Sequence, residues 1–360
     1  MSRPVNFYPG PGALPLPVLE RVREELLDYE DTGLCVMELS HRSPHIIRLI
    51  DDTVARIKRL LGVGEDFDVL LLQGGASLQF CMIPMNLSAP GQKVAYVDTG
   101  YWATKAMEEA GKMHREVQVV ASSREENYTF IPRLDEVEVD AKYLHICSNN
   151  TIYGTAWDRY PRVNVPLAVD MSSDIMSRVV DCNTVDLAYA HAQKTLGPAG
   201  VTVVLLKRGL YDRMETDIPN ILSYAMHAKH NSNYHTPPCF AIYVMNRVLQ
   251  WIENDIGGLA ALEKINAEKA SLLYECIDAS KLFSAPAQAG SRSRMNVVFT
   301  VDRKDLEEDF IGSAERAGIV GLRGHRRVGG CRASIYNAVS LEDVETLVGF
   351  MRAYEKRHSS

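Results

Sequence analysis

Apolar positions along the chain fall into two kinds of pattern. Near the N-terminus they recur every three or four positions over residues 16–29 and 43–63, which predicts two helices, the second ending at Gly62. Further along, short continuous apolar runs predict strands over residues 67–73, 92–98, 115–122, 142–148, 165–172, 184–192 and 201–208. Helical segments alternate with these runs, a pattern typical of an α/β fold with a largely parallel sheet buried on both faces. Because only a short turn precedes residues 201–208, that strand is expected to run antiparallel.

A long helical region over residues 240–279, with a break near Gly257 and Gly258, predicts a bridge to a second unit. That unit is expected to contain a strand, a helix, a second strand and a final helix, over residues 295–301, 305–318, 331–337 and 341–358. The predicted organisation is an N-terminal arm over residues 1–15, a large domain over 16–255 and a smaller α/β domain over 256–360.

Composition narrows the class of protein. With 360 residues, 46% of them hydrophobic, the chain can bury a large core, and its apolar runs fall short of the roughly 20 residues that a membrane span needs. The N-terminus has no apolar stretch of the kind that a secretory signal requires, so a cytoplasmic location is expected. Seven cysteines stand singly, which indicates reduced thiols. A formal net charge of −7 argues against a nucleic-acid surface.

Glycine and small residues follow the first predicted strand. In "LLLQGGASLQF" they allow a tight turn into a helix, where free N–H groups and the Ser77 hydroxyl can face an anion. The segment lacks both the dinucleotide fingerprint GxGxxG and the phosphate loop GxxxxGK[ST], so neither nucleotide site is supported. The alternative is a purely structural turn.

Four further side chains at strand ends can carry chemistry. Trp102 begins a helix after a strand, where an indole can cover a planar ring, and the hydroxyl of Thr151 can contact a ligand. Asp170 ends an apolar strand and can pair with a protonated ring nitrogen, whereas Lys194, desolvated at the next strand's end, can form an imine with an aldehyde. Taken singly they have structural alternatives: a core tryptophan, a turn, a helix cap and a solvated lysine. In this order they match the needs of pyridoxal phosphate.

Two basic clusters can bind anionic groups of a substrate. One is His41 and Arg42, and the other holds Arg323, His325, Arg326, Arg327 and Arg332 within ten residues. Arginine binds carboxylate and phosphate oxygens bidentately, although solvated loops are the alternative. His227, His230 and His235 lack a nearby cysteine or acidic ligand at a fitting spacing, so no metal is assigned.

Nine motifs spread over essentially the whole chain resemble the phosphoserine aminotransferase family, which belongs to class V of the fold type I pyridoxal phosphate enzymes. They are "NFYPGPGALP", "ELSHRS", "LLQGGAS", "DTGYWATKA", "SNNTIYGT", "VDMSSDI", "AHAQKTLGPAG", "TPP" and "GHRRVGGCRASIYNA". The resemblance implies a large domain with a mostly parallel seven-stranded sheet, a smaller C-terminal domain, and a homodimer whose active sites are shared between the chains.

The resemblance also implies roles for residues. Lys194 would bind the cofactor covalently and Asp170 would hold its ring nitrogen, while Trp102 stacks on the ring and Thr151 contacts it. The cofactor phosphate would be held by Ala76, Ser77, Gln193 and, from the other subunit, Thr236 beside His235. Arg332 would pair with the substrate α-carboxylate, and the substrate phosphate would be surrounded by His41, Arg42, His325 and Arg326.

The expected reaction is reversible amino transfer between L-glutamate and 3-phosphohydroxypyruvate in serine biosynthesis, with 4-phosphohydroxy-L-threonine as a further substrate that the family allows. Three positions depart from the commonest family pattern, and one of them is Leu78, where a small or polar residue is common. His235 stands where asparagine is usual, and Arg327 adds a third basic residue that either strengthens phosphate binding or reaches solvent. The alternatives are a class V aminotransferase with a non-phosphorylated substrate and a non-catalytic anion-binding α/β protein.

Overall fold

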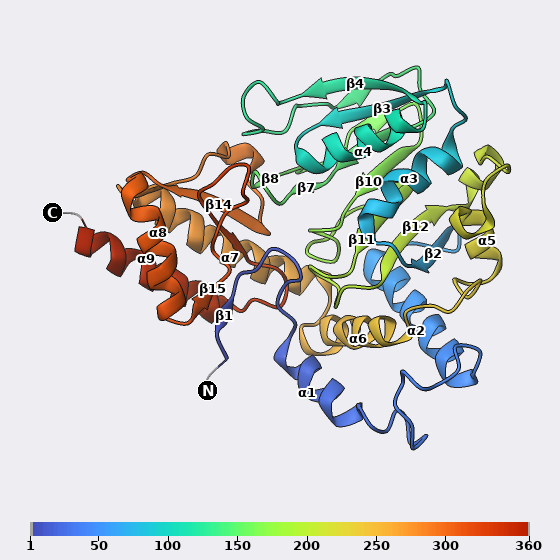
Figure 1. The fold of residues 1–360 in the computed structure, drawn as a ribbon, viewed down its shortest axis with the longest axis horizontal. Helices are drawn as coiled ribbons and strands as arrows, with labels where there is room; N and C mark the ends of the chain where they lie inside the picture. Colours follow the sequence, from blue (N-terminus) through green and yellow to red (C-terminus); the bar gives the residue numbers. More distant parts are fainter. Residues whose placement is uncertain (1–2, 359–360) are drawn as a thin grey trace.

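A seven-stranded, mostly parallel sheet forms the centre of the fold in the computed structural model, which describes residues 3–358 (Figure 1). Its strands are β2 (Phe67–Leu72), β3 (Lys93–Asp98), β4 (Glu116–Ser122), β6 (Leu144–Cys147), β10 (Leu167–Asp170), β11 (Leu187–His191) and β12 (Thr202–Lys207). They are ordered β2-β12-β11-β10-β6-β3-β4. All seven predicted strands are confirmed, and β12 is antiparallel to both of its neighbours, as its short preceding turn predicts.

Helices cover the sheet on both faces. They are α1 (Leu16–Glu25), α2 (Pro44–Leu61), α3 (Gly75–Leu87), α4 (Tyr101–Lys112), α5 (Tyr224–Lys229) and α6 (Cys239–Gln250). Alternate residues of β2 enter different clusters: Val69 and Leu71 pack in the cluster that includes α2 and α6, and Leu70 and Leu72 in the one that includes α3 and α4. Burial of both faces explains the continuous apolar runs of the inner strands, whereas the edge strand β4 is largely exposed.

The predicted alternation of strands and helices holds only for the first half of the sheet. Helices α3 and α4 separate β2, β3 and β4, but irregular segments join the later strands up to β12. These segments contain short strands and 3₁₀ turns: β5 (Glu136–Val137), β7 (Asn149–Asn150), β8 (Thr155–Ala156), β9 (Arg162–Val163) and η1 (Cys182–Thr184). After β12 come η2 (Arg208–Arg213) and η3 (Asn220–Leu222).

The first helix is shorter than predicted. It ends at Glu25, and the chain then turns so that Tyr29 enters the core, where its ring packs edge-on against Tyr243 at 5.4 Å between centroids. The second helix has the predicted stop, since Gly62 adopts a left-handed conformation and caps it with hydrogen bonds to Lys58 and Arg59 carbonyls.

The C-terminal third packs around its own three-stranded sheet (Figure 1). Its elements are α7 (Leu259–Ala279), β13 (Phe283–Ser284), η5 (Ala289–Ser291), β14 (Asn296–Val301), α8 (Lys304–Arg316), β15 (Ile319–Val320), β16 (Cys331–Ser334) and α9 (Leu341–His358). A π-helical turn over Trp251–Asp255 and the pair Gly257–Gly258 separate α6 from α7 at the expected break. The division into domains at residues 255 and 256 stays a prediction.

The N-terminal segment joins this C-terminal unit. Strand β1 (Val5–Asn6) pairs in parallel with β15, and the fully buried Phe7 lies in the core of the C-terminal unit. Residues 8–12 then cross to the central sheet. Within residues 3–358 no helix has the length and apolar character that a membrane crossing requires.

Candidate active site

Five parallel strands of the central sheet end at the same edge, and a predicted site residue lies at or just beyond each end. The turn that contains Ala76 and Ser77 follows β2, Trp102 follows β3 in the first turn of α4, and Thr151 follows β6. Asp170 is the last residue of β10, and Lys194 lies three residues beyond β11. The carboxyl edge of a parallel sheet is where such folds bind ligands.

A cavity of about 610 Å³ lies at this edge. The structure brings nine predicted residues together in its lining: Ala76, Ser77, Trp102, Thr151, Asp170, Gln193, Lys194, His325 and Arg332. The last two come from the C-terminal unit, so the cavity lies between that unit and the central sheet. Its size suits a small-molecule ligand.

Lys194 projects into this cavity beside Trp102. Its Nζ lies 5.8 Å from the centre of the indole. The N-terminal segment passes over the stem, since a Cβ added to Gly10 would lie 3.6 Å from Lys194 Cγ. Burial lowers the pKa of the Lys194 amine, and the charge of Asp170 opposes the shift. A lower pKa gives a larger fraction of neutral amine, the form that attacks a carbonyl.

Asp170 presents a buried carboxylate to the same cavity. It accepts a hydrogen bond of 2.9 Å from the Ser172 N–H, and among residues 3–358 no cationic side chain forms an ion pair with it. Burial raises the pKa of Asp170, while Ser172 and the charge of Lys194 act in the opposite direction. The hydrogen bond from Ser172 is the capping contact that the structural alternative for Asp170 predicts. The buried carboxylate nevertheless has no cation among the described residues in an ion pair with it, as a buried charge usually requires.

Trp102 and Thr151 are fixed relative to one another. The indole Nε1–H donates a hydrogen bond of 3.1 Å to Thr151 Oγ1. Because the two residues follow neighbouring strands, this bond sets the plane of the indole on one side of the cavity.

The small-residue turn forms the start of α3. Gly74 and Gly75 have φ values of 91° and 68°, and a Cβ at Gly74 would lie 2.4 Å from a Leu78 carbon. Glycine is therefore required there, since a side chain would be strained and would collide with Leu78. The first N–H groups of a helix have no partner within the helix, so those at Ala76 and Ser77 are available to an anion in the cavity.

Arg332 is a buried residue of the cavity lining. One guanidinium nitrogen, Nη1, donates a hydrogen bond of 2.8 Å to the Thr151 carbonyl, while Nε–H is buried without a partner among the described residues. Burial lowers the pKa of Arg332. An unpaired donor on a buried cation fits a carboxylate ligand.

Five predicted residues lie outside the cavity lining of their own chain: His41, Arg42, His235, Thr236 and Arg326. The first four are neighbours, since Gln73 Nε2 donates to the Thr236 carbonyl at 2.9 Å and Asn233 Nδ2 donates to the His41 carbonyl at 3.0 Å. Gln73 directly precedes the small-residue turn, so this group lies beside the cavity.

Arg326 and Arg327 are both exposed. The Arg327 guanidinium lies 4.7 Å from the centre of the Tyr101 ring. Of the two alternatives for Arg327, this position agrees with a side chain that reaches solvent while stacking on an aromatic ring.

Sequence reasoning missed several residues of the cavity wall, among them Gly10, Asn149 and His191. Asn149 Nδ2 donates to Ser173 Oγ and to Asn296 Oδ1, both at 2.8 Å, and so connects the central sheet to the C-terminal unit. Its position just after a buried strand was the signal available. Gly10 has no such signal in the sequence, because its contact with Lys194 spans 184 positions of the chain.

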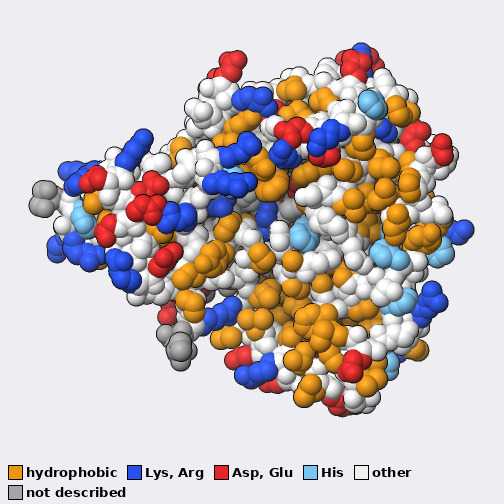
Figure 2. Space-filling model, in the orientation of Figure 1, with side chains coloured by type: hydrophobic (Ala, Val, Ile, Leu, Met, Phe, Trp, Pro, Cys, Tyr) orange, Lys and Arg blue, Asp and Glu red, His pale blue; other side chains and the backbone are white. Residues whose placement is uncertain are grey.

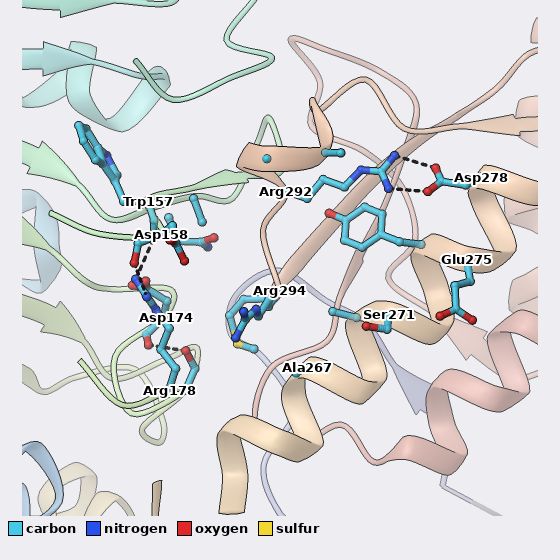
Figure 3. Close-up of a pocket in the computed structure, with 18 residues that line it drawn as sticks. Trp157, Asp158, Asp174, Arg178, Ala267, Ser271, Glu275, Asp278, Arg292 and Arg294 are labelled. Atoms are coloured by element: carbon cyan, nitrogen blue, oxygen red, sulfur yellow. Dashed lines mark hydrogen bonds and ion pairs between the residues drawn. The ribbon is translucent and has the colours of Figure 1, made fainter. Parts of the chain in front are cut away.

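A second cavity, of about 500 Å³, is also lined by Asn149, and Figure 3 shows its charged side chains. Its three arginines already have partners, Arg294 with Glu263 at 3.3 Å among them. Arg292 forms two bonds of 2.6 and 2.7 Å with Asp278, and Arg178 donates at 2.8 Å to the carbonyls of Trp157 and Asp158. We therefore place the chemistry in the Lys194 cavity. Residues 3–358 contain no group of three histidine, cysteine, aspartate or glutamate side chains that is arranged to hold a metal ion.

Comparison with known proteins gives consistent matches. The family model for aminotransferase class V matches residues 5–347. Phosphoserine aminotransferase of Geobacillus kaustophilus is 53% identical over 360 residues, covering 99% of both chains. The solved phosphoserine aminotransferase of Bacillus circulans subsp. alkalophilus is 46% identical, with a TM-score of 0.96 and 99% of both chains covered. A PLP-bound one from Trichomonas vaginalis is 36% identical, with a TM-score of 0.92, covering 97% of this chain and 100% of its own.

Proposed function

The chain belongs to the class V aminotransferase family, and we propose that it transfers an amino group reversibly between L-glutamate and 3-phosphohydroxypyruvate. The products are 2-oxoglutarate and 3-phospho-L-serine. The observation that carries the proposal is that one cavity contains a lysine with a lowered pKa, a buried carboxylate without a cation, and a fixed indole.

These residues fit pyridoxal phosphate as the cofactor. Asp170 would pair with the protonated ring nitrogen, which supplies the cation that this carboxylate lacks. Trp102 would cover one face of the ring, and Ala76, Ser77 and Gln193 would hold the phosphate at the start of α3. When bound, the cofactor supplies an aldehyde that links to amines and a ring that accepts electrons.

Residues of this chain would attach the cofactor, move the proton and orient the substrate. Lys194 Nζ would hold the cofactor aldehyde, and once the substrate amino group has taken its place, the free amine would serve as the base that takes the proton from the substrate α-carbon. Arg332 orients the substrate through its α-carboxylate, using the donors that remain unpaired. Asp170 would keep the ring nitrogen protonated. Glutamate leaves as 2-oxoglutarate before the second substrate binds, so a ping-pong cycle is expected.

We propose that two chains form a homodimer in which each completes the other's site. His41, Arg42 and Thr236 lie beside the cavity of their own chain but do not line it, a position suited to serving a partner. Large apolar side chains are exposed in the same N-terminal region, at Leu16, Leu26, Leu27, Leu34, Met37 and Ile47. Figure 2 shows apolar side chains gathered over the lower part of the view, where Figure 1, in the same orientation, places α1 and α6. Apolar patches of this kind mark interfaces.

The substrate phosphate distinguishes this function from other aminotransferases of the class. We propose that His325 and Arg326 bind it together with His41 and Arg42 of the second chain. A coupled assay should compare 3-phosphohydroxypyruvate with unphosphorylated hydroxypyruvate as amino acceptor, at matched glutamate concentrations. We expect kcat/KM to be at least about 100-fold higher for the phosphorylated acceptor. Equal values would favour a non-phosphorylated substrate, and no turnover of either by the PLP-loaded protein would contradict the proposal.

A further inference from the structure

The imidazole of His191 has one nitrogen engaged and one free. His191 ends β11, three positions before Lys194. Its Nε2 accepts a hydrogen bond of 3.1 Å from the Gly200 N–H. Because an N–H donor needs a lone pair on the acceptor, Nε2 carries no proton, and in the neutral ring the proton is on Nδ1.

The free nitrogen faces the start of α3. A Cβ added to Gly75 would lie 3.5 Å from Nδ1 and 3.7 Å from Cε1, so the imidazole packs directly against the backbone of this helix's first residue. No group among residues 3–358 accepts a hydrogen bond from Nδ1. His191 lines the Lys194 cavity together with Ala76 and Ser77, and its side chain is half-buried.

The ring is held in this orientation from more than one side. The backbone N–H of His191 donates to Ser172 Oγ at 3.3 Å, and Nε2 is fixed by Gly200. The strand therefore sets the position of the side chain, and the loop after Lys194 sets its rotation. A donor fixed before its ligand arrives loses little conformational entropy on binding.

We propose that His191 is an additional ligand of the cofactor phosphate, donating from Nδ1–H to a phosphate oxygen at the start of α3. The inference deepens the proposed function, on which it rests for the identity of the cofactor. Helix N–H groups and the Ser77 hydroxyl would approach the phosphate from one side, and the imidazole would approach it from the end of β11. Burial and the charge of Lys194 lower the pKa of His191, in agreement with a neutral ring that binds as a hydrogen-bond donor.

The test compares His191→Ala with His191→Asn. The asparagine amide can place an N–H near the position of Nδ1, whereas alanine has no donor. Apoenzyme would be titrated with PLP and, separately, with pyridoxal, which has the same ring and aldehyde but no phosphate. We expect His191→Ala to raise the Kd for PLP about tenfold or more and to leave that for pyridoxal within about twofold, while His191→Asn stays close to the unsubstituted protein.

A second readout observes the phosphate itself. The ³¹P resonance of bound PLP should shift in His191→Ala and return toward its original position in His191→Asn. His114→Ala, which changes an exposed histidine, is the matched control for both measurements. An unchanged PLP affinity and ³¹P shift in His191→Ala would overturn the inference. Equal losses for PLP and pyridoxal would also overturn it, because they indicate general damage to the site.

The same variants distinguish binding to the cofactor phosphate from binding to the substrate phosphate. If His191→Ala weakened binding of the phosphorylated amino acceptor and left the affinity for PLP unchanged, the histidine would serve the substrate phosphate, and the assignment to the cofactor would be wrong. These outcomes are distinct from failure of the proposed function, in which the unsubstituted protein would bind no PLP or would transfer no amino group.

Discussion

Arg332 Nη1 donates a hydrogen bond of 2.8 Å to the carbonyl of Thr151. The bond joins strand β16 of the C-terminal unit to the segment that follows β6 of the central sheet. It engages one hydrogen-bond donor of Arg332 with a backbone acceptor and leaves Nε–H buried without a partner among the described residues. A substrate carboxylate that binds here is therefore placed relative to Thr151 and to the indole that Thr151 fixes.

The first prediction separates the two anionic groups of the substrate. Arg332→Ala should lower kcat/KM about 100-fold for glutamate and for 3-phosphohydroxypyruvate, since both have the α-carboxylate. Arg326→Ala should weaken the phosphorylated acceptor far more than glutamate. Steady-state kinetics of both half-reactions measure this, with Arg323→Ala, an exposed arginine paired with Glu308, as the control. Equal losses for both substrates in Arg326→Ala would refute its assignment to the phosphate.

A second prediction concerns Lys194. Lys194→Ala should lower the rate of amino transfer by about 10,000-fold, because it removes both the covalent attachment and the base that moves the proton. Lys207→Ala, at the end of neighbouring strand β12, should leave the rate within about twofold. Borohydride reduction followed by peptide mass spectrometry should place the cofactor on Lys194. Its recovery on another lysine would contradict the mechanism.

The third prediction tests the shared sites. Lys194→Ala and Arg42→Ala should each be nearly inactive alone. After the two proteins are mixed, unfolded and refolded together, random pairing makes half of the dimers mixed, and one of their two sites then has both residues intact. Activity should return to about a quarter of that of the unsubstituted protein treated in the same way. If each chain built its own site, mixing would restore nothing.

A fourth prediction concerns pH and Asp174, which lies in the second cavity (Figure 3). Burial raises its pKa from 3.8 to about 6, while Arg178 and the Ser148 hydroxyl act in the opposite direction. The folded protein therefore prefers the protonated carboxyl. This contribution is complete below pH 3.8 and is lost as the pH rises through about 6.

Asp174→Asn removes that dependence. Between pH 4 and pH 7 the unfolding free energy of the unsubstituted protein minus that of the variant should fall, by up to about 3 kcal/mol. Urea unfolding at a series of pH values measures this difference, and Asp158→Asn, an exposed aspartate of the same cavity, is the control. A difference that stays constant with pH would refute the raised pKa.

Most of the central sheet could be predicted because its strands are buried on both faces and so appear as unbroken apolar runs. The same local signal located Asp170 and Lys194, since each follows such a run. The end of the first helix was missed because a tertiary contact decides it: Tyr29 turns into the core to meet Tyr243. Helical periodicity in residues 26–29 contains no information about that contact.

The cavity wall shows the same limit. His191 occupies an ordinary strand end in the sequence, and its importance emerges only when Gly75, 116 positions earlier, lies against its ring. Gly10 meets Lys194 through the path of the N-terminal segment, which depends on the pairing of β1 with β15. Contacts of this kind follow from the whole fold, so no window of the sequence encodes them.

The hydrogen bond from the Tyr336 hydroxyl to the Pro9 carbonyl, 2.8 Å long, determines when the site can be finished during synthesis. Tyr336 is synthesised 327 residues after Pro9. Until the C-terminal unit has emerged and folded, the N-terminal segment has neither β15 to pair with nor Tyr336 to hold it over Lys194. The wall that covers the lysine is therefore complete only after the C-terminal unit has been synthesised.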